Sequence, residues 1–112
     1  MKLPAFLTNQ PSIEVPIPED VVRTSAIQSD TGLMVIFEFL QDFVLPPHAH
    51  KGQWGTVLAG EIVLTIGDDT QTYTPGMSYN IPSGVVHSAT AAAGSKVIDI
   101  FEEANRYALK AR

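Results

Sequence analysis

The chain has 112 residues, of which 45% are hydrophobic and 17% charged, and its formal net charge at pH 7 is -5. This length and composition predict one globular domain with its own core and exclude an intrinsically disordered chain. A net negative charge without any basic run repels phosphate backbones and anionic lipid headgroups, so we expect neither nucleic acid nor a membrane as a partner. The chain contains no cysteine, which excludes disulfides and thiolate metal sites. Without a signal-peptide pattern or an apolar run of bilayer length, we expect a cytoplasmic location.

Residues 1–24 are predicted to form an extended N-terminal arm, and residues 25–112 a single domain. Four prolines interrupt the stretch between residues 4 and 18. Proline fixes φ and lacks an amide donor, so an extended arm or an edge strand is favoured over a helix.

From Leu33 to Phe101 the chain alternates short apolar runs with turn residues. The clearest run is 62–66, where apolar residues recur with the period of two that is typical of a strand with one buried face. Turn residues close the runs at 67–69, 75–76 and 82–84. Many short strands without helices between them predict an all-β fold of antiparallel strands, either a small β-barrel or jelly roll or a two-sheet sandwich of the immunoglobulin type. Closure removes exposed strand edges, which favours the barrel or jelly roll.

Histidine occurs three times, as His48, His50 and His87. His48 and His50 are two residues apart, so in a strand their side chains point to one face and can converge on an ion. His87 lies on another predicted strand, which a barrel can place opposite the pair. Three neutral imidazoles leave positions on a divalent ion open for water or substrate, as in catalytic metal sites. The alternative is three unrelated histidines, because a His-x-His pair alone is a weak signal.

Two stretches around these histidines resemble the two motifs of the cupin family. Residues 47–60 read Pro-His-Ala-His-Lys-Gly-Gln-Trp-Gly-Thr-Val-Leu-Ala-Gly, which resembles the His-x-His motif that ends in a glycine. Residues 76–87 read Gly-Met-Ser-Tyr-Asn-Ile-Pro-Ser-Gly-Val-Val-His, which matches the second motif of glycine, Pro-x-Gly and histidine. The resemblance covers roughly residues 30–101. It implies a double-stranded β-helix jelly roll that binds one divalent metal ion (Fe, Mn, Ni or Zn) through His48, His50 and His87.

The chain departs from the cupin pattern most clearly at Gln53, where many metal-binding cupins carry a glutamate ligand. Glutamine offers only a neutral amide oxygen, which is a weaker donor than a carboxylate. Gln53 is therefore a candidate ligand through this oxygen, or else it hydrogen-bonds a metal-bound water without touching the ion. Loss of the acidic ligand also leaves open a weak or empty site.

Strand alternation selects the side chains that we expect around the cavity. The expected apolar wall comprises Met34, Ile36, Ile62, Leu64 and Ile98. Trp54 is expected to cap this pocket or to lie in a subunit contact. Glu38 and Tyr79 are candidates for a catalytic acid or base, and the simpler alternatives are a solvent-facing carboxylate and a packing tyrosine. Asp99 lies between two isoleucines and is expected to point away from them, to the outside or to a partner.

A metal-dependent enzyme acting on a small organic molecule is the favoured function. Oxygen chemistry is preferred to isomerase or lyase chemistry, because the metal carries it and the sequence offers few acids or bases. The alternative is a non-catalytic module that binds a sugar or metabolite, with or without metal. Residues 33–40 and 97–101 are apolar on both faces, and cupins that resemble this chain are commonly dimers, so we expect a homodimer.

Overall fold

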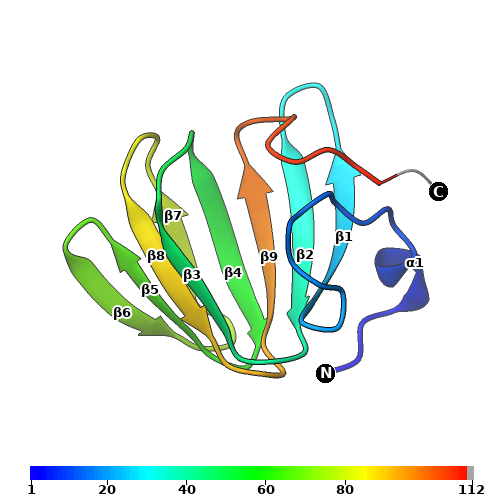
Figure 1. The fold of residues 1–112 in the computed structure, drawn as a ribbon, viewed down its shortest axis with the longest axis horizontal. Helices are drawn as coiled ribbons and strands as arrows, with labels where there is room; N and C mark the ends of the chain where they lie inside the picture. Colours follow the sequence, from blue (N-terminus) through cyan, green and yellow to red (C-terminus); the bar gives the residue numbers. More distant parts are fainter. Residues whose placement is uncertain (111–112) are drawn as a thin grey trace.

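The computed structural model describes residues 1–110 as two antiparallel β-sheets that face each other (Figure 1). The strands are β1 (Val22–Gln28), β2 (Leu33–Phe39), β3 (Phe43–His48), β4 (Gln53–Ala59), β5 (Ile62–Ile66), β6 (Asp69–Tyr73), β7 (Ser78–Ile81), β8 (His87–Ala91) and β9 (Lys96–Phe101). One sheet has the strand order β1-β2-β9-β4-β7 and the other the order β3-β8-β5-β6. Within the described residues no strand ladder joins the two sheets, so the chain is a jelly roll of two facing sheets. The all-β prediction is confirmed.

The two terminal segments lie side by side. Ile13 forms an isolated antiparallel bridge with Leu109. The N-terminal segment contains one helical turn, α1 (Ala5–Thr8), where only an extended arm was expected. Residues 102–110 form turns and this bridge rather than a helix, although their composition is helical. Leu109 packs against a buried cluster that includes Ile13 and Phe101, and this packing outweighs helix propensity. Within residues 1–110, no helix has the length and hydropathy needed to span a bilayer.

A one-residue shift in the pairing of β3 with β8 decides which side chains face the interior. Leu45 pairs with Ala89, but His48 pairs with His87, so β3 contains one extra residue between these two pairs. Leu45 lines the interior cavity, and strict alternation would therefore turn His48 outward. The extra residue falls at Pro46–Pro47, where the absence of amide donors suits an interrupted ladder. The bulge returns His48 to the interior.

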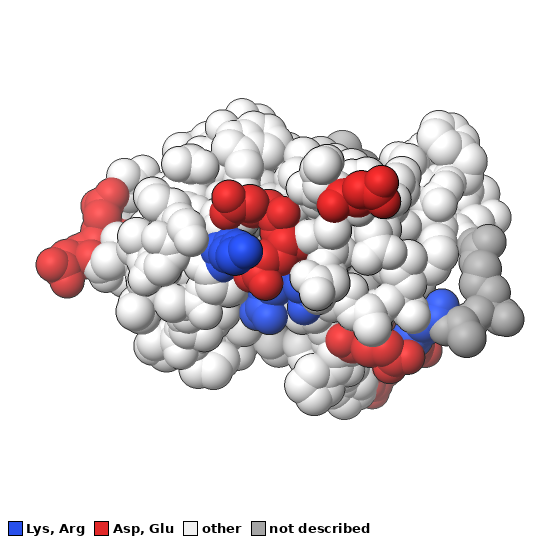
Figure 2. Space-filling model, turned by 90° about the horizontal axis from the view of Figure 1, so that it is seen from above, with Lys and Arg blue, Asp and Glu red and all other residues white. Residues whose placement is uncertain are grey.

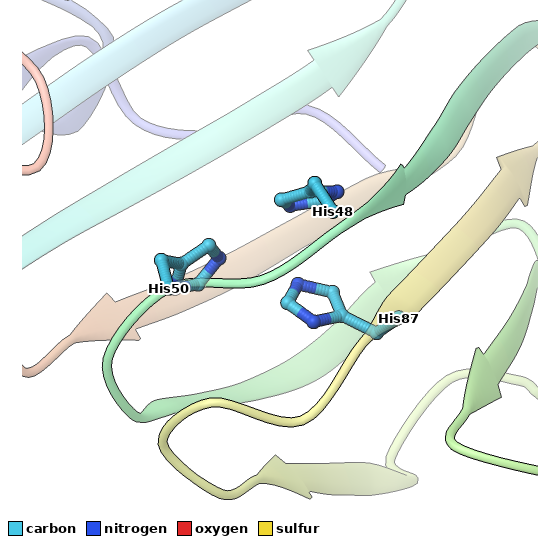
Figure 3. Close-up of side chains that lie close together, drawn as sticks. All are labelled: His48, His50 and His87. Atoms are coloured by element: carbon cyan, nitrogen blue, oxygen red, sulfur yellow. The ribbon is translucent and has the colours of Figure 1, made fainter.

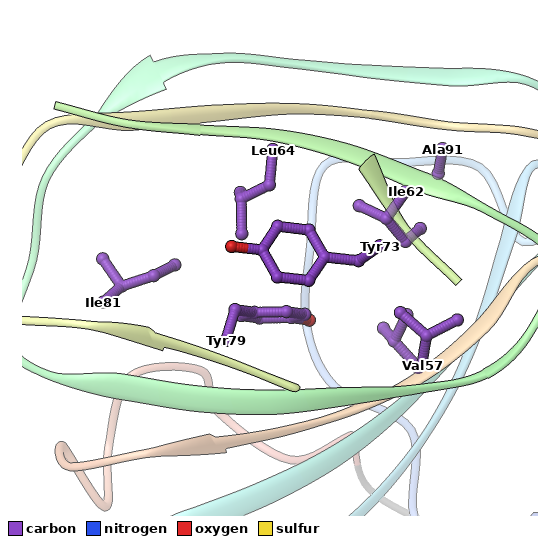
Figure 4. Close-up of a cluster of buried hydrophobic side chains, with 8 residues drawn as sticks. Val57, Ile62, Leu64, Tyr73, Tyr79, Ile81 and Ala91 are labelled. Atoms are coloured by element: carbon purple, nitrogen blue, oxygen red, sulfur yellow. The ribbon is translucent and has the colours of Figure 1, made fainter. Parts of the chain in front are cut away.

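The main core fills the space between the sheets (Figure 4). Its buried side chains come from both sheets and are Val57, Ile62, Leu64, Tyr73, Tyr79, Ile81, Ala91 and Val97. Ile62 and Leu64 point inward from β5 and line the cavity.

The outer face of the five-stranded sheet carries Met34, Ile36 and Ile98, three residues that we expected in the cavity wall. On β9 the buried positions are instead Val97, Asp99 and Phe101, and the cavity lining contains none of the three. The expectation is corrected because β2 and β9 are apolar on both faces, so alternation alone fits either orientation. Ile36 stays buried on the outer face, in register with Ser25.

Ser95 stabilises the turn between β4 and β5 through two hydrogen bonds. The buried Ser95 hydroxyl accepts a hydrogen bond from the Glu61 amide at 3.0 Å and donates one to the Glu61 carbonyl at 3.1 Å. Gly60 has a φ of 78°, and a Cβ at this position would collide with Ser95. Glycine is therefore required here for both backbone conformation and space.

We predict that Gly60→Ala destabilises the fold by about 2 kcal/mol more than Gly94→Ala does. Both glycines have positive φ, 78° and 89°, so both substitutions carry the same backbone penalty of about 1–2 kcal/mol. Only Gly60 adds a collision, because a Cβ at Gly94 meets no atom within 4 Å. The free energies of unfolding from urea titrations measure the difference. Equal losses would show that Ser95 moves aside without cost.

Candidate metal centre

The three histidines converge at one end of the jelly roll (Figure 3). His48 ends β3, His50 lies in the loop that follows, and His87 begins β8. The ring centroids are 5.2 Å apart for His48 and His50, 4.2 Å for His48 and His87, and 4.8 Å for His50 and His87. One nitrogen from each ring lies within 4.8 Å of the others. The structure thus brings together the three residues that the sequence proposed as ligands.

Backbone carbonyls orient all three rings through Nδ1. The contacts join His48 to Pro46 at 3.0 Å, His50 to Lys51 at 2.7 Å and His87 to Val85 at 3.0 Å. A carbonyl oxygen only accepts hydrogen bonds, so Nδ1 carries the proton in each neutral ring and Nε2 keeps its lone pair. This is the tautomer that binds a metal through Nε2.

The surroundings of His87 Nε2 indicate whether the three histidines fit a metal ion. This atom is buried and has no hydrogen-bond partner among the described residues. An unpartnered buried polar atom costs about 1–3 kcal/mol, a cost that coordination to an ion would remove. Three neutral imidazoles suit a divalent Fe, Mn, Ni or Zn ion and leave further positions on it open. The residues present therefore fit a divalent metal.

Burial and nearby charges favour the neutral forms of His50 and His87. Burial lowers the pKa of His50 and of His87, and the charges of Arg106 and His48 lower both further. The backbone hydrogen bonds at Nδ1 and, for His50, the charge of Glu103 oppose this effect only in part. Both rings are therefore deprotonated at neutral pH, as metal binding requires.

The histidines line a largely apolar cavity of about 100 Å³ between the two sheets. A water-sized group needs roughly 10–15 Å³ on this measure, so the space suits an ion and a small organic molecule. Gln53 and Tyr79 line this cavity, as do Phe37, Phe39, Phe43, Leu45 and Phe101.

Trp54, which we expected to cap the pocket or to lie in a subunit contact, does not line the cavity. It is 44% exposed and follows Gln53 on the outer side of β4. Glu38 does not line the cavity either, although it is buried and its Oε1 has no partner among the described residues. Tyr79 is therefore the candidate acid or base that lies in the cavity.

A buried carboxyl group in the cavity escaped the sequence analysis. Asp99 faces the interior and lines the cavity, although we expected it to point outward. Its Oδ1 accepts a 2.7 Å hydrogen bond from the Tyr79 hydroxyl. Burial raises the pKa of Asp99 to about 6, while hydrogen bonds from Tyr79 and Gln53 oppose this rise. Strand alternation could have indicated this position, because Asp99 lies on the same face of β9 as Val97 and Phe101, and both of these side chains are buried. Asp99 is thus a group in the cavity that can hold or release a proton near neutral pH.

Arg106 is a second residue that the sequence analysis did not identify. Burial is the largest cause of the lowered pKa of His50 and of His87, and the positive charge of Arg106 lowers both further. The guanidinium stacks over the Tyr107 ring, 4.7 Å from its centroid. Arg106 Nε is buried without a partner among the described residues. A guanidinium with a free donor is suited to hold a carboxylate.

The end of the molecule that carries the histidines has acidic and basic side chains close together near its centre (Figure 2). Here the loop after His50 is tied to the segment after β9. The Lys51 amide donates to Glu103 Oε1 at 3.1 Å, and the Gly52 amide to Glu102 Oε2 at 2.9 Å. These bonds hold the His50 loop against the chain segment that leads to Arg106.

The motifs, the fold and the site agree with a family model described as "Cupin domain", which matches residues 35–101. The chain belongs to the cupin family. Among solved structures, this cupin is similar to an RmlC-like cupin from Shewanella frigidimarina, with 24% identity, 88% of each chain covered and a TM-score of 0.75. It is also similar to KdgF from Halomonas sp., with 23% identity, 80% of this chain and 84% of that chain covered, and a TM-score of 0.70.

A third similar structure is the oxalate decarboxylase of Bacillus subtilis, with 18% identity and a TM-score of 0.73. The alignment covers 89% of this cupin but only 29% of that chain. No curated protein matches the sequence. At these identities the three structures show a shared fold, and function has to be argued from the site.

We predict that Asp99→Asn stabilises the metal-free protein more at pH 7 than at pH 4. The pKa of Asp99 rises from 3.8 to about 6 on folding, so its carboxyl group is protonated in both states below 3.8 and ionised in both above 6. Its contribution to stability is therefore present at low pH and lost as the pH rises through about 6. At about 1.4 kcal/mol for each pKa unit, the gain from the neutral amide changes by roughly 3 kcal/mol. Urea unfolding at both pH values measures this, and equal effects of the substitution would contradict a raised pKa.

Proposed function

We propose that this cupin is a metal-dependent enzyme that acts on a small organic molecule with a carboxylate group, and that its reaction includes proton transfer by Asp99. The observation that carries the proposal is that Asp99 lines the same cavity as the three histidines. A metal site alone fits a binding module equally well. An acid or base beside it is what an enzyme needs in addition.

The chain's own residues have separate roles in this proposal. His48, His50 and His87 hold the ion, which would polarise a carbonyl or carboxylate oxygen of the substrate. Asp99 accepts or donates a proton, because a pKa of about 6 makes both forms accessible near neutral pH. The aromatic and aliphatic wall excludes water from the reacting group. Gln53 is placed beside Asp99, and ligation of the ion by its amide oxygen stays part of the proposal.

Arg106 supports a carboxylate as the recognised group. Its positive charge lowers the pKa of His50 and of His87, and its Nε is buried without a partner among the described residues. Arg106 is not among the residues that line the cavity, so in this proposal its positive charge favours a carboxylate in the cavity by electrostatic attraction, while the ion and Asp99 contact the substrate.

The presence of Asp99 alters the order of the candidate reactions. The sequence favours oxygen chemistry because the metal carries it and because Glu38 and Tyr79 are the only candidate acids or bases that the sequence offers. With Asp99 there, isomerase or lyase chemistry that moves a proton is better supported. Mn²⁺ is the first ion to test, because a similar structure, the B. subtilis oxalate decarboxylase, has Mn(II) centres.

We predict that the wild-type protein and Asp99→Asn each bind about one Mn²⁺ per chain, whereas His87→Ala binds none. Metal content after reconstitution and dialysis measures this. With a panel of small keto and hydroxy acids in D₂O, the loaded wild type should incorporate solvent deuterium, and chelation should stop the incorporation. Asp99→Asn should slow it by on the order of 100-fold or more. Metal binding without exchange of any acid would favour the alternative, a non-catalytic binding module.

We also propose that this cupin is a cytoplasmic homodimer that pairs through the outer face of the five-stranded sheet. One row of residues crosses four strands in register on this face: Ile27, Met34, Ile100 and Trp54. No member of the row is charged, and Ile27, Ile100 and Trp54 are each more than 40% exposed. An exposed apolar row of this kind suits a self-complementary interface.

We predict that Ile100→Lys converts the dimer to a monomer, because a second copy would bury the introduced charge without a partner. Val44→Lys should leave the dimer intact, since Val44 is an exposed apolar residue of β3 in the other sheet. Size-exclusion chromatography with light scattering gives the mass of each form. A monomeric wild type would refute the proposed interface.

A further inference from the structure

Asp99 is one member of a row that crosses three neighbouring strands. Gly55 on β4 pairs with Tyr79 on β7 on one side and with Asp99 on β9 on the other. The Tyr79 side chain reaches across the middle strand, and its hydroxyl donates to Asp99 Oδ1 at 2.7 Å. A hydrogen bond between residues two strands apart needs a free passage over the strand between them.

Gly55 supplies this passage because it has no side chain. A Cβ at this position would overlap Asp99 Oδ1 and would lie 2.5 Å from the Tyr79 hydroxyl oxygen. Any other residue at position 55 would therefore have to displace the hydrogen-bonded pair. The backbone of Gly55 has no positive φ, so the reason for glycine here is space and not conformation.

We propose that Tyr79 and Gly55 are positioning residues that hold the Asp99 carboxyl group in a single orientation toward the cavity. Tyr79 donates to Oδ1, Gln53 also donates to the carboxyl group, and Gly55 keeps the path between the Tyr79 and Asp99 side chains open. The proposal rests on the proposed function of Asp99, but the orientation of the carboxyl group can be measured without metal or substrate.

The neighbouring Tyr73 provides a control that distinguishes a positioning role of Tyr79 from a packing role. Tyr73 and Tyr79 are both buried and pack edge to face, with ring centroids 5.4 Å apart. Figure 4 shows their hydroxyl groups at opposite ends of the pair. Tyr79 is bonded to Asp99, and Tyr73 has no side-chain hydrogen bond among those found in the described residues. Removing the Tyr73 hydroxyl thus alters the same cluster without touching Asp99.

The experiment compares wild type with Tyr79→Phe, Gly55→Ala and the control Tyr73→Phe by NMR of the metal-free protein. Side-chain couplings of labelled aspartate report whether Asp99 occupies one χ1 rotamer. We expect one rotamer in the wild type and in Tyr73→Phe, and averaging over rotamers in Tyr79→Phe and Gly55→Ala. In the metal-loaded deuterium assay, the two positioning variants should lose about 10- to 100-fold in rate. Tyr73→Phe should stay within about twofold of the wild type, the range of a change that leaves the reacting groups in place.

A single Asp99 rotamer in Tyr79→Phe would overturn the proposal, because other wall residues would then fix the carboxyl group. Tyr79→Phe decides this even if Gly55→Ala does not fold, since it removes one oxygen atom and adds no volume. Averaging in Tyr73→Phe as well would also overturn it, because general loosening of the core would explain the result. The rotamer measurement stands when no acid exchanges deuterium, so failure of the proposed function is recognised separately.

Discussion

The side chains of β3 change faces at Pro46–Pro47, and the position of the histidine cluster depends on that change. Before the bulge Leu45 faces the cavity, and after it His48 faces the cavity and pairs with His87. A regular ladder would put a proline opposite His87 and turn His48 to the outside. The bulge also bends the strand, and bulges are enriched beside active sites for this reason. The position of the candidate metal centre thus depends on the backbone register of β3 as well as on the three imidazoles.

The same backbone fixes the chemistry of the rings. Each Nδ1 is bound by a carbonyl one or two residues away in the chain, so the tautomer and the ring plane follow from local conformation. Burial then keeps His50 and His87 neutral. The apolar wall that lowers the pKa of these imidazoles also raises the pKa of Asp99, because a low dielectric disfavours every charged form. The same apolar surroundings thus favour neutral His50 and His87 and a carboxyl group that titrates near neutral pH. Burial of this carboxyl group lowers the stability of the fold at neutral pH.

The motifs around the three histidines allowed the fold and the histidine cluster to be predicted, because both depend on spacing along the chain. The cavity wall could be predicted only in part. β5 has polar or half-buried residues on one face, so alternation placed Ile62 and Leu64 inside. β9 is apolar on both faces, and alternation therefore fits two orientations that differ by one residue. Choosing Ile98 for the interior placed Asp99 outside.

The residues on the neighbouring strands, and not the pattern of β9 itself, determine which face of β9 points to the interior. A carboxyl group inside an apolar strand needs a donor, and the face that offers one is the face that it occupies. On the inner face Tyr79 supplies the hydroxyl, and Gly55 in the strand between leaves room for it to reach Asp99. The row of register that contains Asp99 also holds Ala26, Val35, Gly55 and Tyr79, and among these Tyr79 carries the side-chain donor. Which face an isolated charge takes is therefore a question about donors on neighbouring strands, and it can be asked once the strand order of the family is known.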